Sequence, residues 1–97
     1  MSYEEYLTNY IQQVENVHLS AKSAPTTGLN DERTALIRDI ELQTAKAKDT
    51  LGSNRALLIG AYNTADAAGK AKLEADLKEM ILGIEQVERA LIKAIGR

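Results

Sequence analysis

One pair of residues in this chain has the spacing of metal ligands. Glu15 and His18 form an E-x-x-H fragment, which carboxylate-bridged di-iron bundles carry on two of their helices. Such a site needs two of these fragments and two further inward glutamates, whereas this chain has one histidine. Both residues flank an apolar stripe, where an exposed Glu and a boundary His are ordinary. We therefore predict no metal ligands and no cofactor, with a metal-binding bundle as the alternative.

The next candidates for chemistry are two carboxylates one helical turn apart, Glu85 and Glu88. General acid and base catalysis requires two carboxylates in different environments of one cleft, and the sequence indicates no such cleft. Glu85 precedes Arg89 by four residues, which is the spacing of a pair on a helix surface. A nucleophilic triad would depend on the single histidine, and the chain has no cysteine. We predict solvated pairs, no catalytic residues and no enzyme, with a small all-α enzyme as the alternative.

A third candidate is a band of basic residues that helical folding would bring toward one end of the molecule: Lys46, Lys48, Arg55, Lys70 and Lys72. Weak nucleic-acid binding is the functional interpretation. However, acidic residues lie between these bases, and the net charge of -2 offers little attraction for phosphate. We expect a solvated face and keep nucleic-acid binding as an alternative.

An apolar rhythm that occurs three times predicts the elements that carry these residues. Steps of three and four residues alternate, as in helices that pack lengthwise in a coiled coil. The stripes cover residues 3–21, 37–61 and 73–94. A chain of 97 residues is long enough to bury one continuous core. The sequence therefore predicts a single all-α helical-bundle domain over residues 1–97.

Capping residues set the boundaries of the predicted helices. Ser2 with Glu5 three residues later is a helix start, and Pro25 ends the first helix. Asp31 opens the second helix, and Asp66 is the expected N-cap of the third. We predict helices over about 2–22, 31–63 and 66–95. They form a three-helix antiparallel bundle in which the last two helices make a long hairpin.

Two glycines bear on the geometry of this hairpin. Gly52 could cap a helix and start a new one, giving four helices, but the stripe continues through it, which favours one helix with a kink. Pairing the hairpin about residue 65 sets Thr44 near Ile84 and Ile37 near Ile92. It also places Gly83 beside small residues of the second helix, so we expect the two backbones to approach closely there.

The first helix is too short to cover the hairpin. It has a length of about 30 Å against roughly 45 to 50 Å for each hairpin helix. Exposed apolar patches of this kind mark interfaces. We predict a homodimer whose interface lies toward the hairpin tip and includes Leu57, Leu58, Tyr62, Leu73 and Leu77. The tyrosines of the first helix, Tyr3, Tyr6 and Tyr10, are expected to pack against the termini of the hairpin.

These patterns favour a non-enzymatic protein that acts through protein–protein contacts, as an adaptor, an assembly subunit or a regulator. The informative residues form interfaces, and no catalytic set is complete. Acidic residues stand near the start of the chain, and no apolar run approaches the roughly 20 residues that span a bilayer. We predict a cytoplasmic protein with no membrane contact, which forms a homo-oligomer and has a possible protein partner.

Overall fold

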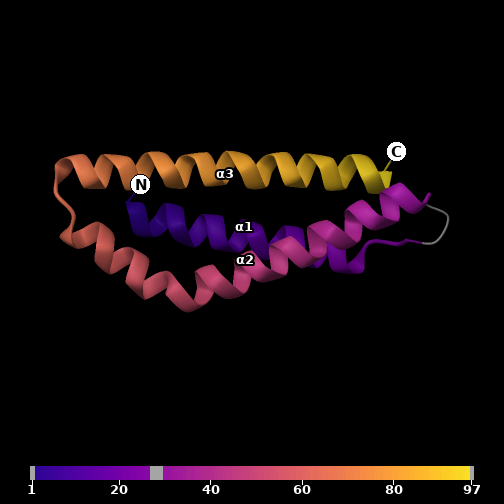
Figure 1. Cartoon of the computed structure of the whole chain (residues 1–97), viewed down its shortest axis with the longest axis horizontal. Coiled ribbons are helices and arrows are strands. Elements are labelled where there is room, and N and C mark those ends of the chain that lie inside the picture. Colours follow the sequence, from indigo (N-terminus) through magenta and orange to yellow (C-terminus); the bar gives the residue numbers. More distant parts are fainter. Residues whose placement is uncertain (1, 27–29, 97) are drawn as a thin grey trace.

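Three long α-helices make up the fold. The computed structural model describes residues 2–26 and 30–96, with α1 over Tyr3–Ser23, α2 over Asp31–Thr64 and α3 over Ala67–Gly96 (Figure 1). The predicted all-α three-helix bundle is confirmed, and each helix begins and ends within one residue of its predicted bounds. α2 and α3 lie antiparallel in a molecule that measures 52 × 21 × 18 Å.

Each helix begins at a side chain that accepts a hydrogen bond from a backbone amide. These bonds satisfy donors that the first turn of a helix leaves unpaired. The side-chain oxygen of Ser2 accepts from the Glu5 amide at 3.2 Å, that of Asn30 from Arg33 at 2.8 Å and that of Asp66 from Gly69 at 2.7 Å. The starts predicted from Ser2 and Asp66 are therefore confirmed.

The core is unevenly distributed among the helices. α1 buries its whole stripe, whereas the buried residues of α2, namely Ile37, Ile40 and Thr44, all lie in its first half. The buried hydroxyl of Thr44 donates to the Ile40 carbonyl at 2.7 Å, so this polar group is hydrogen-bonded within the core. α1 contacts α2 more extensively than it contacts α3. The second half of α2 is thus only partly covered.

The first turn of α1 lies near the connection between α2 and α3 (Figure 1). Tyr3 is 6% exposed and stacks on Tyr62, with ring centroids 4.2 Å apart and planes inclined by 16°. The prediction that this tyrosine packs against the termini of the hairpin is therefore wrong. Because the short loop after α1 makes α1 antiparallel to α2, the start of α1 points toward the hairpin tip. α1 therefore covers a part of the hairpin near its tip that was expected to be uncovered.

α2 continues as one helix through Gly52, and it bows away from α3 in its middle (Figure 1). The alternative with a break at Gly52 and four helices does not occur. A Cβ atom built on Gly52 would meet no atom within 4 Å. Glycine at this site therefore leaves backbone freedom in the unfolded chain and gains no packing in return.

Gly52→Ala should raise the free energy of unfolding by up to about 1 kcal/mol, because alanine has the higher helix propensity and the site has room. Urea denaturation followed by circular dichroism measures this change. Gly69→Ala is the matched control, since a Cβ there would lie 3.1 Å from both Ala65 Cβ and Asp66 Oδ1, the capping atom. No gain is expected from the control. A loss of stability in Gly52→Ala would contradict the continuous helix.

Candidate interaction surfaces

The residues predicted to form the interface differ widely in exposure. Leu57 is 72% exposed, whereas Leu58, Tyr62 and Leu73 are half-buried. We call these four residues the hairpin surface. Leu77, the fifth predicted residue, is 3% exposed within the single chain. Its burial requires no second molecule, because α1 extends farther toward the hairpin tip than expected.

A cluster around Tyr62 joins all three helices near the hairpin tip. One contact is the stack on Tyr3 of α1, and the Tyr62 hydroxyl donates a hydrogen bond to the carboxylate of Glu74 on α3. The Lys70 ammonium lies 5.7 Å from the centroid of the Tyr62 ring. The hydrogen bond to Glu74 raises the pKa of Tyr62, and burial, with the charge of Asp76, raises the pKa of Tyr3. The cluster fixes the start of α1 to the hairpin.

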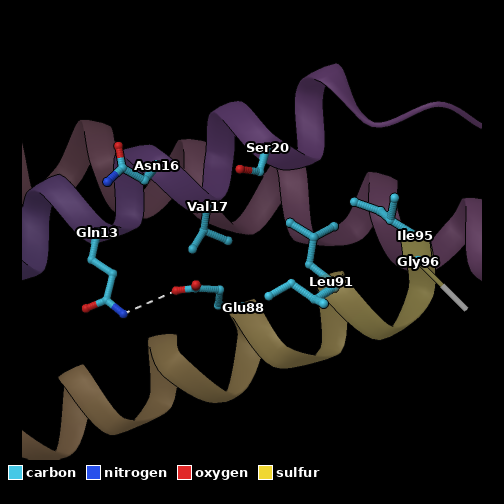
Figure 2. A pocket seen from close by; sticks show the side chains of 9 residues that line it. Gln13, Asn16, Val17, Ser20, Glu88, Leu91, Ile95 and Gly96 are labelled. Carbon is cyan, nitrogen blue, oxygen red and sulfur yellow. Dashed lines mark hydrogen bonds between the residues drawn. The ribbon is translucent and has the colours of Figure 1, made fainter.

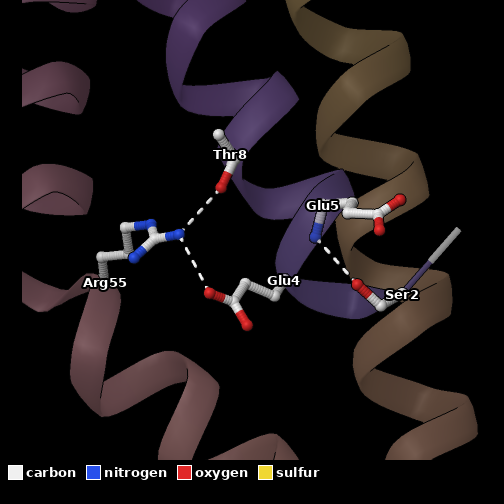
Figure 3. Close-up of polar contacts among 5 residues, drawn as sticks. All are labelled: Ser2, Glu4, Glu5, Thr8 and Arg55. Carbon is white, nitrogen blue, oxygen red and sulfur yellow. Dashed lines mark hydrogen bonds and ion pairs between the residues drawn. The ribbon is translucent and has the colours of Figure 1, made fainter.

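A second polar contact near the same end ties α2 to α1. Nη2 of Arg55 lies 3.3 Å from Oε1 of Glu4 and donates to Oγ1 of Thr8 at 2.9 Å (Figure 3). Exposed ion pairs contribute little to stability, but this pair offsets the charge of one basic-band residue. Lys70, another member of the band, lies over Tyr62. Two of the five residues of the basic band, Arg55 and Lys70, therefore interact through their charged groups with side chains of their own chain.

A groove lies between α2 and α3. It has a volume of about 340 Å³ and is lined by Tyr10, Gln43, Thr44, Ala47, Met80, Gly83, Ile84 and Val87. Thr44 and Ile84 share this groove, in agreement with the predicted pairing. The expected close approach at Gly83 is wrong, because a Cβ built there would meet no atom within 4 Å. The helices are separated enough at this level to leave open space beside the glycine.

Leu57 lies ten residues, or nearly three helical turns, after Ala47, the last α2 residue that lines this groove. Residues seven apart on a helix occupy nearly the same angular position, since seven residues make almost two turns. Leu57 is fourteen residues after Gln43, which lines the groove, and Thr50 stands between them. Each heptad drifts by about 20°, so Leu57 is turned about 40° from Gln43 around the helix axis, away from Ala47.

A second groove lies between α1 and α3, near the C-terminal end of α3 (Figure 2). Its volume is about 380 Å³, and its lining residues are Gln13, Asn16, Val17, Ser20, Glu88, Leu91, Ile92, Ile95 and Gly96. Nε2 of Gln13 donates to Oε2 of Glu88 across the groove at 3.5 Å. The expectation that Glu88 is a solvated surface residue is therefore wrong, because its side chain is half-buried against α1.

This groove was not predicted from the sequence. Its signal is a row of uncharged polar residues beside the α1 stripe, where Gln13, Asn16 and Ser20 follow at steps of three and four. A helix face made of uncharged polar residues is consistent with a surface that a neighbouring helix covers only in part. No pattern in α3 marks Glu88 as the residue opposite this row, because helix rotation depends on tertiary packing.

The two residues of the E-x-x-H fragment differ in burial and in their contacts. Glu15 is exposed, and His18 is half-buried with its Nδ1–H donating to the Glu41 carbonyl of α2 at 3.2 Å. His18 thereby links α1 to α2. Among residues 2–26 and 30–96, no three His, Cys, Asp or Glu side chains are grouped to hold a metal ion.

Comparison with known proteins finds no matching family, no similar curated protein and no similar solved structure. In the described part of the chain, no helix has the length and apolar character needed to cross a membrane. Functional argument therefore depends on the surfaces of this molecule alone.

Proposed function

We propose that this chain is a non-enzymatic helical protein that acts through protein–protein contacts and self-associates as a homodimer through its hairpin surface. The observation that carries the proposal is Leu57, which is 72% exposed on the second half of α2. Burying a leucine side chain contributes about 1.5 to 3 kcal/mol. A second copy of the chain would supply that burial.

The neighbourhood of Leu57 on the hairpin supports an interface. Interface cores are depleted of charged residues, and every residue that lines the α2–α3 groove, about three turns before Leu57 along α2, is uncharged at neutral pH. The groove is also predominantly apolar, with Met80 and Val87 on its α3 wall. Leu58 and Leu73 add half-buried apolar area at the hairpin tip. These features extend the contact beyond one side chain.

The polar groups of the chain favour binding over catalysis. The groups whose pKa is raised, Tyr3, Tyr10 and Tyr62, are part of helix packing. Burial is the main cause of the raised pKa of Tyr3 and Tyr10, and the hydrogen bond to Glu74 is the main cause for Tyr62. These causes are contacts that hold the helices together. Arg55 pairs with Glu4, which weakens the basic band as a nucleic-acid surface. Contact with protein is the function that remains best supported.

Leu57→Glu should convert the protein to a monomer, because it places a charge in the proposed interface. Light scattering coupled to size exclusion measures the mass, with twice the chain mass of 10.6 kDa expected for the unmodified protein. Leu82→Glu is the matched control. Leu82 is also exposed, at 58%, but it does not line the α2–α3 groove or belong to the hairpin surface.

Circular dichroism should show both variants as helical as the unmodified chain. A single-chain mass for the unmodified protein would contradict self-association. If Leu82→Glu becomes a monomer while Leu57→Glu remains dimeric, the interface lies on α3 around Leu82 and not on the hairpin surface.

A further inference from the structure

The α1–α3 groove combines an apolar floor with one carboxylate. Val17 and Leu91 are buried at its base, and Ile95 is half-buried beside them. The Glu88 carboxylate enters from α3 and faces the amide of Gln13 (Figure 2). Small-molecule sites have this composition, in which apolar walls bind a ligand and a few polar groups orient it.

The carboxylate of Glu88 has no basic partner. Within residues 2–26 and 30–96 it forms no ion pair, and its one hydrogen bond, from Gln13, is long at 3.5 Å. Lys22 is the basic residue of α1, and it does not line the groove. A half-buried carboxylate without a counter-charge favours a cationic ligand, because a charge-assisted hydrogen bond is stronger in a partly desolvated site.

The end of the groove adds to this electrostatic preference. Gly96 lines it and is the last residue of α3, so the carbonyl groups of the final helical turn lie close to the groove. The C-terminus of a helix carries a partial negative charge. The facing residues of α1, Asn16 and Ser20, are uncharged. Among the described residues, the lining of the groove thus has a negative charge and no positive one, which disfavours an anionic head group.

We propose that the α1–α3 groove binds a small cationic amphiphile, with its alkyl chain on Val17, Leu91 and Ile95 and its ammonium group on the carboxylate of Glu88. The volume of about 380 Å³ is at the lower end of the range for ligand pockets. One unbranched alkyl chain with a primary ammonium group fits this description. The site is separate from the hairpin surface and does not depend on the oligomeric state of the protein.

Three ligands with the same alkyl chain test the proposal: protonated decylamine, neutral decanol and anionic decanoate, each below its micelle-forming concentration. Calorimetry on the full chain measures each Kd, and amide chemical shifts locate the site. Decylamine should bind about tenfold more tightly than decanol, the effect of one charge-assisted hydrogen bond. Decanoate should bind more weakly than decanol. The largest shifts should occur at Gln13 and Gly96.

Glu88→Gln should remove the preference for the amine and leave decanol binding unchanged. Glu85→Gln is its control, since Glu85 is a half-buried carboxylate on the same helix that does not line the groove. The preference should persist in that control.

Ser20→Trp should fill the groove and abolish binding of all three ligands. Leu19→Trp, at an exposed neighbouring position outside the groove, should preserve binding. The proposal is overturned if the ligands bind with equal affinity, if none of them binds, if Glu88→Gln keeps the preference, or if the shifts centre on another surface.

Discussion

Leu91→Ala should lower the free energy of unfolding by about 2 to 5 kcal/mol, the range for removing a buried leucine side chain. Leu91 is 2% exposed and is among the most completely buried large side chains of the core. It also forms the base of the α1–α3 groove, so the truncation would enlarge a space that already exists. Urea denaturation monitored by circular dichroism measures the change.

The neighbouring residue provides the matched control. Ile92 is 60% exposed, and Ile92→Ala should change the free energy of unfolding by less than about 0.5 kcal/mol. The two variants differ by one position and remove aliphatic side chains of the same size. Equal losses in both would contradict the orientation of α3, and a larger loss at Ile92 would indicate a helix rotated by one residue.

This pair of residues separates what the apolar stripe determined from what the pairing across the hairpin did not: the stripe of the third helix contained Leu91 and not Ile92, and Leu91 is the buried one. The sequence paired Ile37 with Ile92, whereas the buried residue of that turn is Leu91. Helix boundaries follow from local signals, namely a capping side chain or a proline, and these were correct within one residue. The rotation of a helix depends on which side chains interlock across the core. Counting residues from the middle of the connection gives only an approximate register across the hairpin, so it paired Ile37 with a residue one position from the buried one.

The candidate surfaces were predictable to different degrees. Leu57 was predicted as an exposed interface residue by comparing helix lengths, and it is 72% exposed. However, α1 reaches this level of α2, where Glu4 pairs with Arg55, so the exposure follows from the position of Leu57 outside the apolar stripe of α2. Burial of Leu77 within the single chain was not predicted, because the start of α1 was expected at the termini of the hairpin and lies instead against Tyr62 near its tip. The groove at Glu88 was not predictable, because it requires a residue from α1 and a residue from α3 to meet at a particular level.

The burial of Leu77 makes the contact of Tyr3 with the hairpin tip important for the fold. If α1 did not reach Tyr62, the apolar residues near the tip would lose their cover. The first turn of a helix at the end of a chain is ordinarily the part that opens most readily. In this chain, the stack of Tyr3 on Tyr62 and the pair between Glu4 and Arg55 fix that part in place.

Tyr3→Ala should lower the free energy of unfolding by about 3 kcal/mol, the lower end of the range for truncating a buried aromatic side chain. The loss includes the buried ring and the stacked pair with Tyr62. Tyr3→Phe is the control, because it keeps the ring, and it should be within about 1 kcal/mol of the unmodified protein. Chemical denaturation gives both values.

Hydrogen exchange separates a local role for Tyr3 from a global one. In Tyr3→Ala the amides of the first two turns of α1 and those around Tyr62 should exchange faster than the amides around Leu91, because the contact joins only the tip end of the bundle. In Leu91→Ala exchange should accelerate throughout the three helices, since that residue lies in the shared core. Uniform acceleration in Tyr3→Ala would contradict the division of this elongated bundle into a core end and a tip end. The division agrees with the distribution of buried residues in α2, which all lie in its first half, whereas Leu57 in the second half is 72% exposed.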